Sequence, residues 1–249
     1  MPGRVLFVSD THLRPDGVPG ADEHAERFFS FVRDAASQKG AKRIETMYVL
    51  GDLFDYWYEP GGRAPAVFAS RCESIGRLVA DGLRVVVLPG NRDFLLGRGF
   101  VAATGAELAA PELTIELGDH HVRLLHGDAL MPDCHRYRMW VRLSRGGGFR
   151  RFCAGLPETV AQSIARLIRG VSASEKRRSA PRAVCFSRNE LESRYARGAD
   201  TIVAGHFHEC VDILAEAPST SGRLVILSSW DDSRGAHAVW DGDGLRVVR

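Results

Sequence analysis

The sequence has little of three features that would each define a class of protein. Its five cysteines are odd in number and form no C-x-x-C pair, so neither a disulfide framework nor a thiolate zinc site is indicated. No apolar run approaches the length of a transmembrane helix, and the N-terminal apolar run reaches Ser9 and Asp10 too early for a signal peptide. The formal net charge of +2 is too small to indicate wholesale binding of nucleic acid. We therefore expect a cytoplasmic protein, with peripheral attachment to the cytoplasmic face of an inner membrane still allowed.

The sequence does have ample material for a core, since 45% of its 249 residues are hydrophobic. In the first hundred residues, short β-branched runs alternate with stretches of helical spacing, which predicts a parallel sheet with crossover helices. Later runs indicate a hairpin and then a series of strands, so two sheets packed together with helices outside are expected. The strands are predicted at 4–9, 47–50, 83–88, 114–117, 122–125, 201–204, 211–214, 224–228, 236–240 and 245–248, and the helices at 21–38, 66–81 and 99–104.

The composition changes between residues 131 and 191, where the spacing is helical and strongly basic. We interpret residues 131–191 as an inserted helical cap on a core made of residues 1–130 and 192–249. An apolar stripe runs through it and is compatible with core packing, or with a basic amphipathic surface that contacts anionic lipid headgroups or acyl chains. The stripe consists of Val160, Ile164, Leu167, Ile168 and Val171.

Five apolar runs end in residues that can bind a metal. One such residue alone is more often a cap or turn residue, but the joint occurrence of five indicates a metal site. Oxygen and imidazole ligands without thiolate suit Mn²⁺, Fe²⁺ or Zn²⁺, and seven of them exceed the needs of one tetrahedral ion. Two ions that share a carboxylate would use them all, which is an arrangement typical of phosphate ester hydrolysis. The seven residues are Asp10, His12, Asp52, Asn91, His126, His206 and His208.

The motifs around these residues resemble the five-block signature of the calcineurin-like metallophosphoesterases. They are Asp10-x-His12, Gly51-Asp52-x-x-Asp55, Gly90-Asn91-x-Asp93, His126-Gly127-Asp128 and Gly205-His206-x-His208. The resemblance covers the chain except the cap and implies a four-layer αββα sandwich with two divalent ions, expected to be Mn²⁺, at the strand ends. It assigns one ion to Asp10, His12, Asp52 and His208, and the other to Asp52, Asn91, His126 and His206.

A narrower resemblance lies in residues 50–57 and 90–97, which are similar to the UDP-2,3-diacylglucosamine pyrophosphatases of lipid A biosynthesis. It implies hydrolysis of a UDP-linked acylated sugar to UMP and 2,3-diacylglucosamine 1-phosphate. Arg92 stands where the wider family commonly has histidine, a candidate proton donor. We predict that Arg92 and Asn91 hold phosphate oxygens, because a guanidinium offers a planar bidentate fork. The residues predicted to support the ligands and turn amides, with simple turn capping as the alternative, are Asp55, Asp93 and Asp128.

The chain departs from this pattern after His126-Gly127-Asp128. The family usually has threonine, leucine and cysteine there, followed by two acids, whereas this chain has Ala129-Leu130-Met131 and retains only Asp133 of the pair. Substrate contacts are expected from the cap, at Asp133, Trp140, Ile164, Ile168, Ser172 and Lys176.

Two other functions stay open on the sequence. A soluble metallophosphodiesterase that acts on nucleotides or nucleic acid could use the same metals, with the basic cap along the backbone. A scaffold that has lost its metals would lack ligands, and none of the seven is missing. The histidines outside the pattern, among them His24, are expected to be surface or loop groups.

Overall fold

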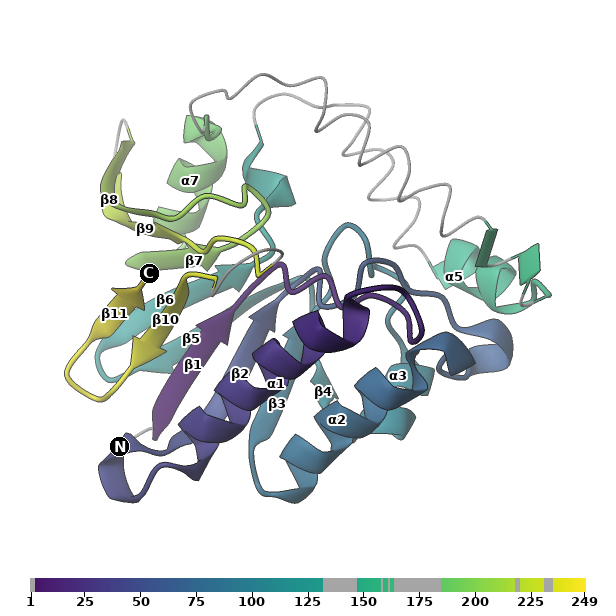
Figure 1. Cartoon of the computed structure of the whole chain (residues 1–249). Helices are drawn as coiled ribbons and strands as arrows, with labels where there is room; N and C mark the ends of the chain where they lie inside the picture. The colour runs from purple at the N-terminus through teal and green to yellow at the C-terminus, as the bar shows by residue number, and fades with distance from the viewer. Residues whose placement is uncertain are drawn as a thin grey trace.

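Two β-sheets packed face to face form the centre of the computed structural model (Figure 1). No helix within the described ranges is long and apolar enough to cross a membrane. The structure describes residues 3–131, 147–157, 159–160, 162–163, 185–217, 220–230 and 235–249.

The first sheet is built on the predicted parallel unit. β1 pairs parallel with β2, β2 with β3 and β3 with β4, while β10 and β11 extend the other edge in antiparallel pairing. In spatial order the strands are β11 (Leu245–Val248), β10 (His237–Trp240), β1 (Arg4–Val8), β2 (Ile44–Leu50), β3 (Arg84–Leu88) and β4 (Glu107–Leu108).

Helices α1 (Ala21–Ser37) and α2 (Ala69–Ala80) cover the outer face of this sheet (Figure 1). They bury the side chains whose helical spacing predicted them, with Phe28 and Ile75 among the most enclosed. The remaining short elements on this side are η1 (Gly40–Lys42), η2 (Pro60–Gly62), η3 (Ala66–Phe68) and α3 (Arg98–Thr104).

The second sheet contains the predicted hairpin, since β5 and β6 pair antiparallel. β6, β7 and β9 run parallel to one another, and β8 pairs antiparallel with β9 at the edge. In spatial order the strands are β5 (Glu112–Leu117), β6 (His120–Leu125), β7 (Thr201–Ala204), β9 (Thr220–Ile226) and β8 (Val211–Ala217).

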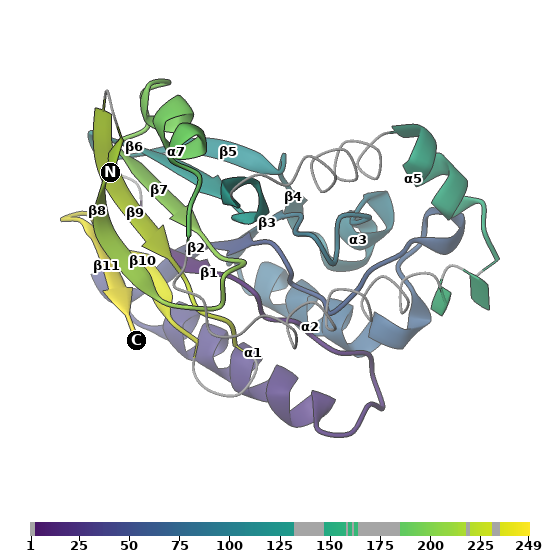
Figure 2. The ribbon, with the colours of Figure 1, turned by 90° about the horizontal axis from the view of Figure 1, so that it is seen from above.

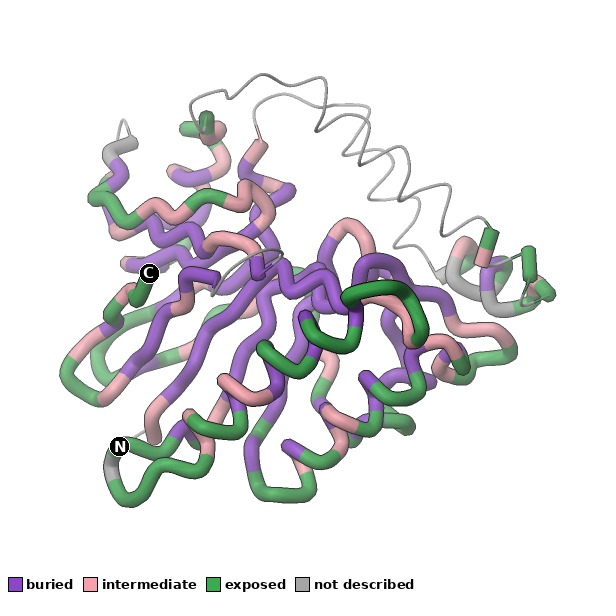
Figure 3. The backbone as a smooth tube through the Cα atoms, viewed as in Figure 1, coloured by how far each residue is buried: buried purple, intermediate pink, exposed green. Residues whose placement is uncertain are grey.

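Successive residues of a strand point to opposite faces and so enter different apolar layers. In β1, Val5 and Phe7 pack between the two sheets, whereas Leu6 and Val8 pack under the helices beside Phe28. Figure 3 shows buried residues along the strands of both sheets. Each side chain of this size contributes about 1.5–3 kcal/mol when it is fully buried.

Helix α7 (Arg188–Tyr195) forms a fourth layer on the outer face of the second sheet. Leu191 and Tyr195 pack there against Ile202 and Ile226. The order of layers is therefore helices, sheet, sheet, helix, and the expected four-layer αββα sandwich is confirmed.

The structure differs from the prediction most clearly at three elements. The helix predicted at 66–81 begins with a 3₁₀ turn and becomes α-helical only at Ala69. The strand predicted at 224–228 begins at Thr220 instead, because the polar residues at its start pair with β8 and carry no apolar alternation. The short strand β4 was not expected.

The two chain segments that flank the predicted cap lie side by side. The Ser187 amide donates to the Leu130 oxygen at 2.8 Å, and η4 (Asp128–Leu130) and α7 are in contact. Helix α5 (Gly147–Ala154) contacts η2 and lies on the same side as α3 (Figure 2). The predicted end of the cap at residue 191 falls inside α7, which packs on the second sheet.

Truncation of Leu191 tests whether α7 is a packed layer. Leu191→Ala should lower the free energy of unfolding by about 2–4 kcal/mol, because it leaves a cavity against the second sheet. Asn189→Ala, on the exposed side of the same helix, should change it by less than about 0.5 kcal/mol. Urea unfolding measures both variants, and equal, small losses would contradict the packing of α7.

Candidate metal centre

The site lies where the parallel strands of both sheets end. β1, β2 and β3 end before Asp10, Asp52 and Asn91, so these side chains lie at one edge of the first sheet. The loops after β1 and β2 continue to pair: the Asp10 amide donates to the oxygen of Gly51 at 3.2 Å, and the His12 amide to that of Asp52 at 3.0 Å. Each loop is thereby held in register with the next.

The second sheet adds the histidines. β6 ends before His126 and β7 before His206, and the two turns are joined because the Gly205 amide donates to the His126 oxygen at 2.8 Å. His208 follows two residues later on the same turn. The seven residues predicted from five strand ends are thus brought to one place by the packing of two sheets.

Five of the seven have a left-handed backbone. In the part of the chain that the structure describes, these are also the only non-glycine residues with positive φ. Aspartate and histidine adopt this region more readily than most residues, yet such strain costs on the order of 1–3 kcal/mol each and occurs mainly at functional sites. The residues and angles are Asp10 (52°), His12 (45°), Asp52 (51°), His206 (72°) and His208 (60°).

Two glycines permit the close approach of these turns. A Cβ on Gly205 would lie 1.8 Å from Ser9 Oγ and 2.3 Å from Asp10 Oδ2. A Cβ on Gly90 would lie 2.2 Å from Asp52 Oδ1. The motif glycines are therefore needed because backbone sits where a side chain would displace a candidate ligand.

The first group of converging side chains consists of Asp10, His12 and His208. Asp10 Oδ2 accepts hydrogen bonds from Ser9 Oγ and the His206 amide, both at 2.7 Å, which fixes the carboxylate. Its Oδ1 then lies 3.2 Å from His208 Nε2 and 3.8 Å from His12 Nε2. The two imidazole nitrogens are themselves 3.2 Å apart.

The second group consists of Asn91, His126 and His206. Asn91 Oδ1 lies 2.8 Å from His126 Nε2 and 3.0 Å from His206 Nδ1, and these two nitrogens are 3.2 Å apart. His126 Nδ1 lies 2.9 Å from the oxygen of Leu50. That carbonyl can only accept, so Nδ1 carries a proton, and in the neutral ring the Nε2 lone pair faces the group.

Asp52 lies between the two groups. Its Oδ1 is 3.6 Å from His126 Nε2, and its Oδ2 is 3.9 Å from His12 Nδ1. Asp10, Asp52 and His126 also form a set whose donor atoms lie within 4.8 Å of one another, as Asp10, His12 and His208 do. Asp10 is thus common to these two sets, while Asp52 contacts one histidine of each group.

Burial and mutual charge shift the pKa values in opposite directions. Burial raises the pKa of Asp10, but the surrounding imidazoles, His208 first, hold it well below its usual value. Burial keeps the pKa of Asp52 raised despite the nearby His126. Burial lowers the pKa of His126, yet the carboxylates around it, Asp52 first, raise it to about 9, whereas burial and then His126 lower the pKa of His206 to about 4. Asp128 acts on both imidazoles by its charge.

Arg92 contacts the site from its rim. Its guanidinium lies 2.7 Å from Asp55 Oδ1 and 3.4 Å from Asp52 Oδ2, and its amide donates to Asp52 Oδ1 at 2.8 Å. Asp93 is fully buried and accepts hydrogen bonds from the amides of Gly90 and Leu53, both at 2.7 Å, which ties together the turns that carry Asn91 and Asp52. Burial and the charge of Asp52 raise the pKa of Asp93 to about 7.

The donor geometry fits divalent cations. Among the described residues, none makes a hydrogen bond of good geometry to Asp10 Oδ1, although this oxygen is buried and points to the imidazoles of His12 and His208. In the second group, an amide oxygen faces two imidazole nitrogens at hydrogen-bond distance. Oxygen and nitrogen donors brought this close, with a fixed carboxylate, are the arrangement that a hard or borderline ion needs.

Some functional contacts were not predicted from the sequence. Ser9 orients Asp10, and Met131 Sδ lies 3.2 Å from His206 Nε2. A serine beside a motif carries no signal of its own, and Met131 was noted only as a departure. The predicted substrate residues Asp133, Trp140, Ile164, Ile168, Ser172 and Lys176 lie outside the described residues.

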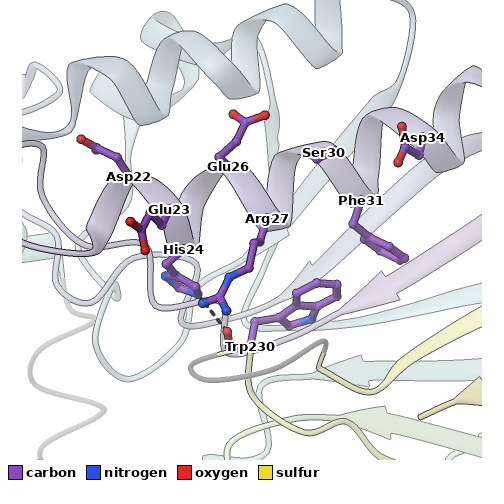
Figure 4. Close-up of a pocket in the computed structure, with 9 residues that line it drawn as sticks. All are labelled: Asp22, Glu23, His24, Glu26, Arg27, Ser30, Phe31, Asp34 and Trp230. Atoms are coloured by element: carbon purple, nitrogen blue, oxygen red, sulfur yellow. Dashed lines mark hydrogen bonds between the residues drawn. The ribbon is translucent and has the colours of Figure 1, made fainter.

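The expectation for His24 was wrong. It is buried on α1, and Figure 4 shows its ring directed at the main-chain oxygen of Trp230, 2.9 Å from Nε2. The Trp230 amide in turn donates to the Asp10 oxygen at 3.1 Å. A pocket of about 790 Å³ borders these residues, and its described lining contains no candidate ligand. That lining consists of Asp22, Glu23, His24, Glu26, Arg27, Ser30, Phe31, Asp34 and Trp230.

Comparison with known proteins places this site in a family. The chain is 32% identical over 246 residues to the UDP-2,3-diacylglucosamine hydrolase of Chromobacterium violaceum, covering 98% of both chains. It is 30% identical to the protein of the same name from Pseudomonas putida strain W619, covering 98% of this chain and 97% of that one. The sequence model of the family described as Calcineurin-like phosphoesterase matches residues 3–210. This chain therefore belongs to the calcineurin-like phosphoesterases, a family of metal-dependent hydrolases.

Proposed function

We propose that the chain hydrolyses the pyrophosphate bond of UDP-2,3-diacylglucosamine to UMP and 2,3-diacylglucosamine 1-phosphate. One observation carries the proposal: two groups of side chains, each with oxygen and imidazole donors, lie next to each other and beside the guanidinium of Arg92. This arrangement combines sites for cations with a fork for phosphate oxygens. The relatives named for the same substrate match nearly full length, which supports the choice of substrate.

The proposed metal content is two Mn²⁺ ions. Asp10, His12, Asp52 and His208 would hold one, and Asp52, Asn91, His126 and His206 the other. When bound, two such ions acidify water and neutralise charge that develops on the transferred phosphoryl group. The protein contributes fixed donors, because Asp10 is oriented by two hydrogen bonds and His126 by the Leu50 carbonyl.

Arg92 and Asn91 are the proposed contacts to phosphate oxygens. Asp55 holds the Arg92 guanidinium at the rim, where its Nη1 makes a 2.7 Å contact and the side chain stays 12% exposed. A guanidinium positioned in this way can offer two parallel donors to a phosphate, which lysine cannot. Asp93 and Asp128 support the site through turn amides and charge.

Residues 131–191 are the proposed cap over the acyl chains and the proposed contact with the membrane surface. In its described part, Phe152 on α5 is 63% exposed and Val160 is 42% exposed. Apolar side chains within a basic segment suit a surface of anionic lipid, where a diacylated substrate resides. The cap residues predicted to contact substrate keep that role as part of this proposal.

A panel of substrates tests the function. With Mn²⁺, the protein should release UMP from UDP-2,3-diacylglucosamine with kcat/KM at least about a hundredfold above that for bis-p-nitrophenyl phosphate, because only the former uses remote binding energy. Single-stranded DNA should stay intact. Activity restricted to bis-p-nitrophenyl phosphate and DNA would replace this proposal with a soluble metallophosphodiesterase.

Two substitutions should separate metal binding from phosphate binding. His126→Ala should lose bound metal and lower turnover by more than about a hundredfold, since even outer partners of metal ligands are worth 10–100-fold. Arg92→Lys should retain the metal and still lose turnover, because the bidentate fork is gone.

Metal analysis and UMP release measure both variants. His121→Ala, an exposed histidine outside the group, is the matched control and should behave as the wild type. Full metal content and full activity in His126→Ala would contradict the proposed metal site.

Removal of the exposed apolar side chains should affect only the lipid substrate. Phe152→Ser combined with Val160→Ser should raise the apparent KM for UDP-2,3-diacylglucosamine in anionic vesicles at least about tenfold. Full burial of a large apolar side chain contributes about 1.5–3 kcal/mol, and a tenfold change needs only about 1.4 kcal/mol. Hydrolysis of bis-p-nitrophenyl phosphate should not change. Leu214→Ser, 70% exposed on β8, is the control. An unchanged KM in the double variant would contradict the role of the cap.

A further inference from the structure

Met131 is the first residue beyond η4 and contacts a candidate metal ligand. Its Sδ lies 3.2 Å from His206 Nε2, while Nδ1 of the same ring faces Asn91 Oδ1 at 3.0 Å and His126 Nε2 at 3.2 Å. One edge of the His206 ring is therefore directed into the second donor group, and the other edge is directed at a thioether.

The backbone around Met131 holds this contact in place. Leu130 is fully buried among the side chains under α7, and its oxygen accepts the Ser187 amide at 2.8 Å. The amide of Leu130 donates to the oxygen of Gly127 at 2.9 Å, which closes the turn after His126. Met131 is thus fixed relative to the metal centre by the core and not by solvent-exposed chain.

A neutral imidazole carries its proton on one nitrogen only, and the partner of the other nitrogen selects which. Without metal, His206 could place the proton on Nδ1 and donate to Asn91 Oδ1. That tautomer has no lone pair for an ion in the second donor group. The alternative places the proton on Nε2, which faces the weak acceptor Met131 Sδ at 3.2 Å.

We propose that Met131 is a positioning residue that holds His206 in the Nε2–H tautomer, so that the Nδ1 lone pair is available to the second ion. The inference rests on the proposed metal centre. It also gives a role to the sequence Ala129-Leu130-Met131, which differs from the family pattern after the fourth motif. Met131 provides a weak hydrogen-bond acceptor on the side of the His206 ring that faces away from the second donor group. His126 has the stronger carbonyl of Leu50 in the equivalent role.

Mn²⁺ titration of the metal-free protein by calorimetry tests the proposal. Met131→Leu keeps the size of the side chain and removes the acceptor. It should weaken one of two binding steps by about five- to tenfold, at or just below the smallest effects of outer partners, because a thioether is a weak acceptor. Met131→Gln offers an amide oxygen as acceptor and should bind Mn²⁺ at least as tightly as the wild type. Met47→Leu, the same change in the core under the helices, should leave both steps unchanged.

Nitrogen NMR of the histidine side chains reports which ring nitrogen of His206 carries the proton, and a loss of packing alone would not change this. In the metal-free wild type a measurable share of the His206 proton should reside on Nε2, and in Met131→Leu that share should fall in favour of Nδ1. Unchanged Mn²⁺ binding and tautomer in Met131→Leu, or equal weakening in the Leu and Gln variants, would overturn the inference. A wild type that binds no Mn²⁺ would instead overturn the proposed metal centre itself.

Discussion

The structure depends on the convergence of five strand ends in strained backbone. Asp10, Asp52 and three histidines have left-handed φ values, and such residues persist only where the surroundings over-determine them. Here the surroundings include hydrogen bonds between neighbouring turns, such as that from the Gly205 amide to the His126 oxygen. They also include motif glycines at positions where neighbouring atoms leave no room for a side chain. The two packed sheets supply the rigidity that holds these turns.

Because these residues converge, buried charged groups lie close together, and the protein compensates their charges only in part. Two buried carboxylates lie among four imidazoles, and their pKa values move apart: that of Asp10 falls and that of Asp52 rises. Arg92 offsets some of the negative charge through its contacts with Asp52 and Asp55. Divalent cations would satisfy donors that protein groups alone leave crowded against one another. The same crowding that strains the fold therefore favours ion binding.

The sequence was sufficient for the elements whose signal is local. The β-branched runs of β1 and β3, broken by a polar turn, predicted both the strands and the site residues that follow them. It was insufficient for β9, whose first residues are polar and are held by pairing with β8. His24 was misjudged for a related reason, because its burial follows from the approach of the distant Trp230. Contacts between segments far apart in sequence leave no trace in periodicity.

The same limit explains which parts of the site could be named from sequence. Ligand-type residues follow strands, so topology alone brings Asp10, Asp52 and Asn91 to one edge. Which donor group a side chain joins depends on which of its atoms faces the neighbouring rings. For Asp10 this is set by hydrogen bonds from Ser9 and from the amide of His206, which follows a strand of the other sheet. Asp10 Oδ1 faces the imidazoles of His12 and His208 because the other oxygen is held by these two donors. The identity of the candidate ligands thus follows from the sequence motifs, whereas the orientation of their side chains follows from the packing of the sheets.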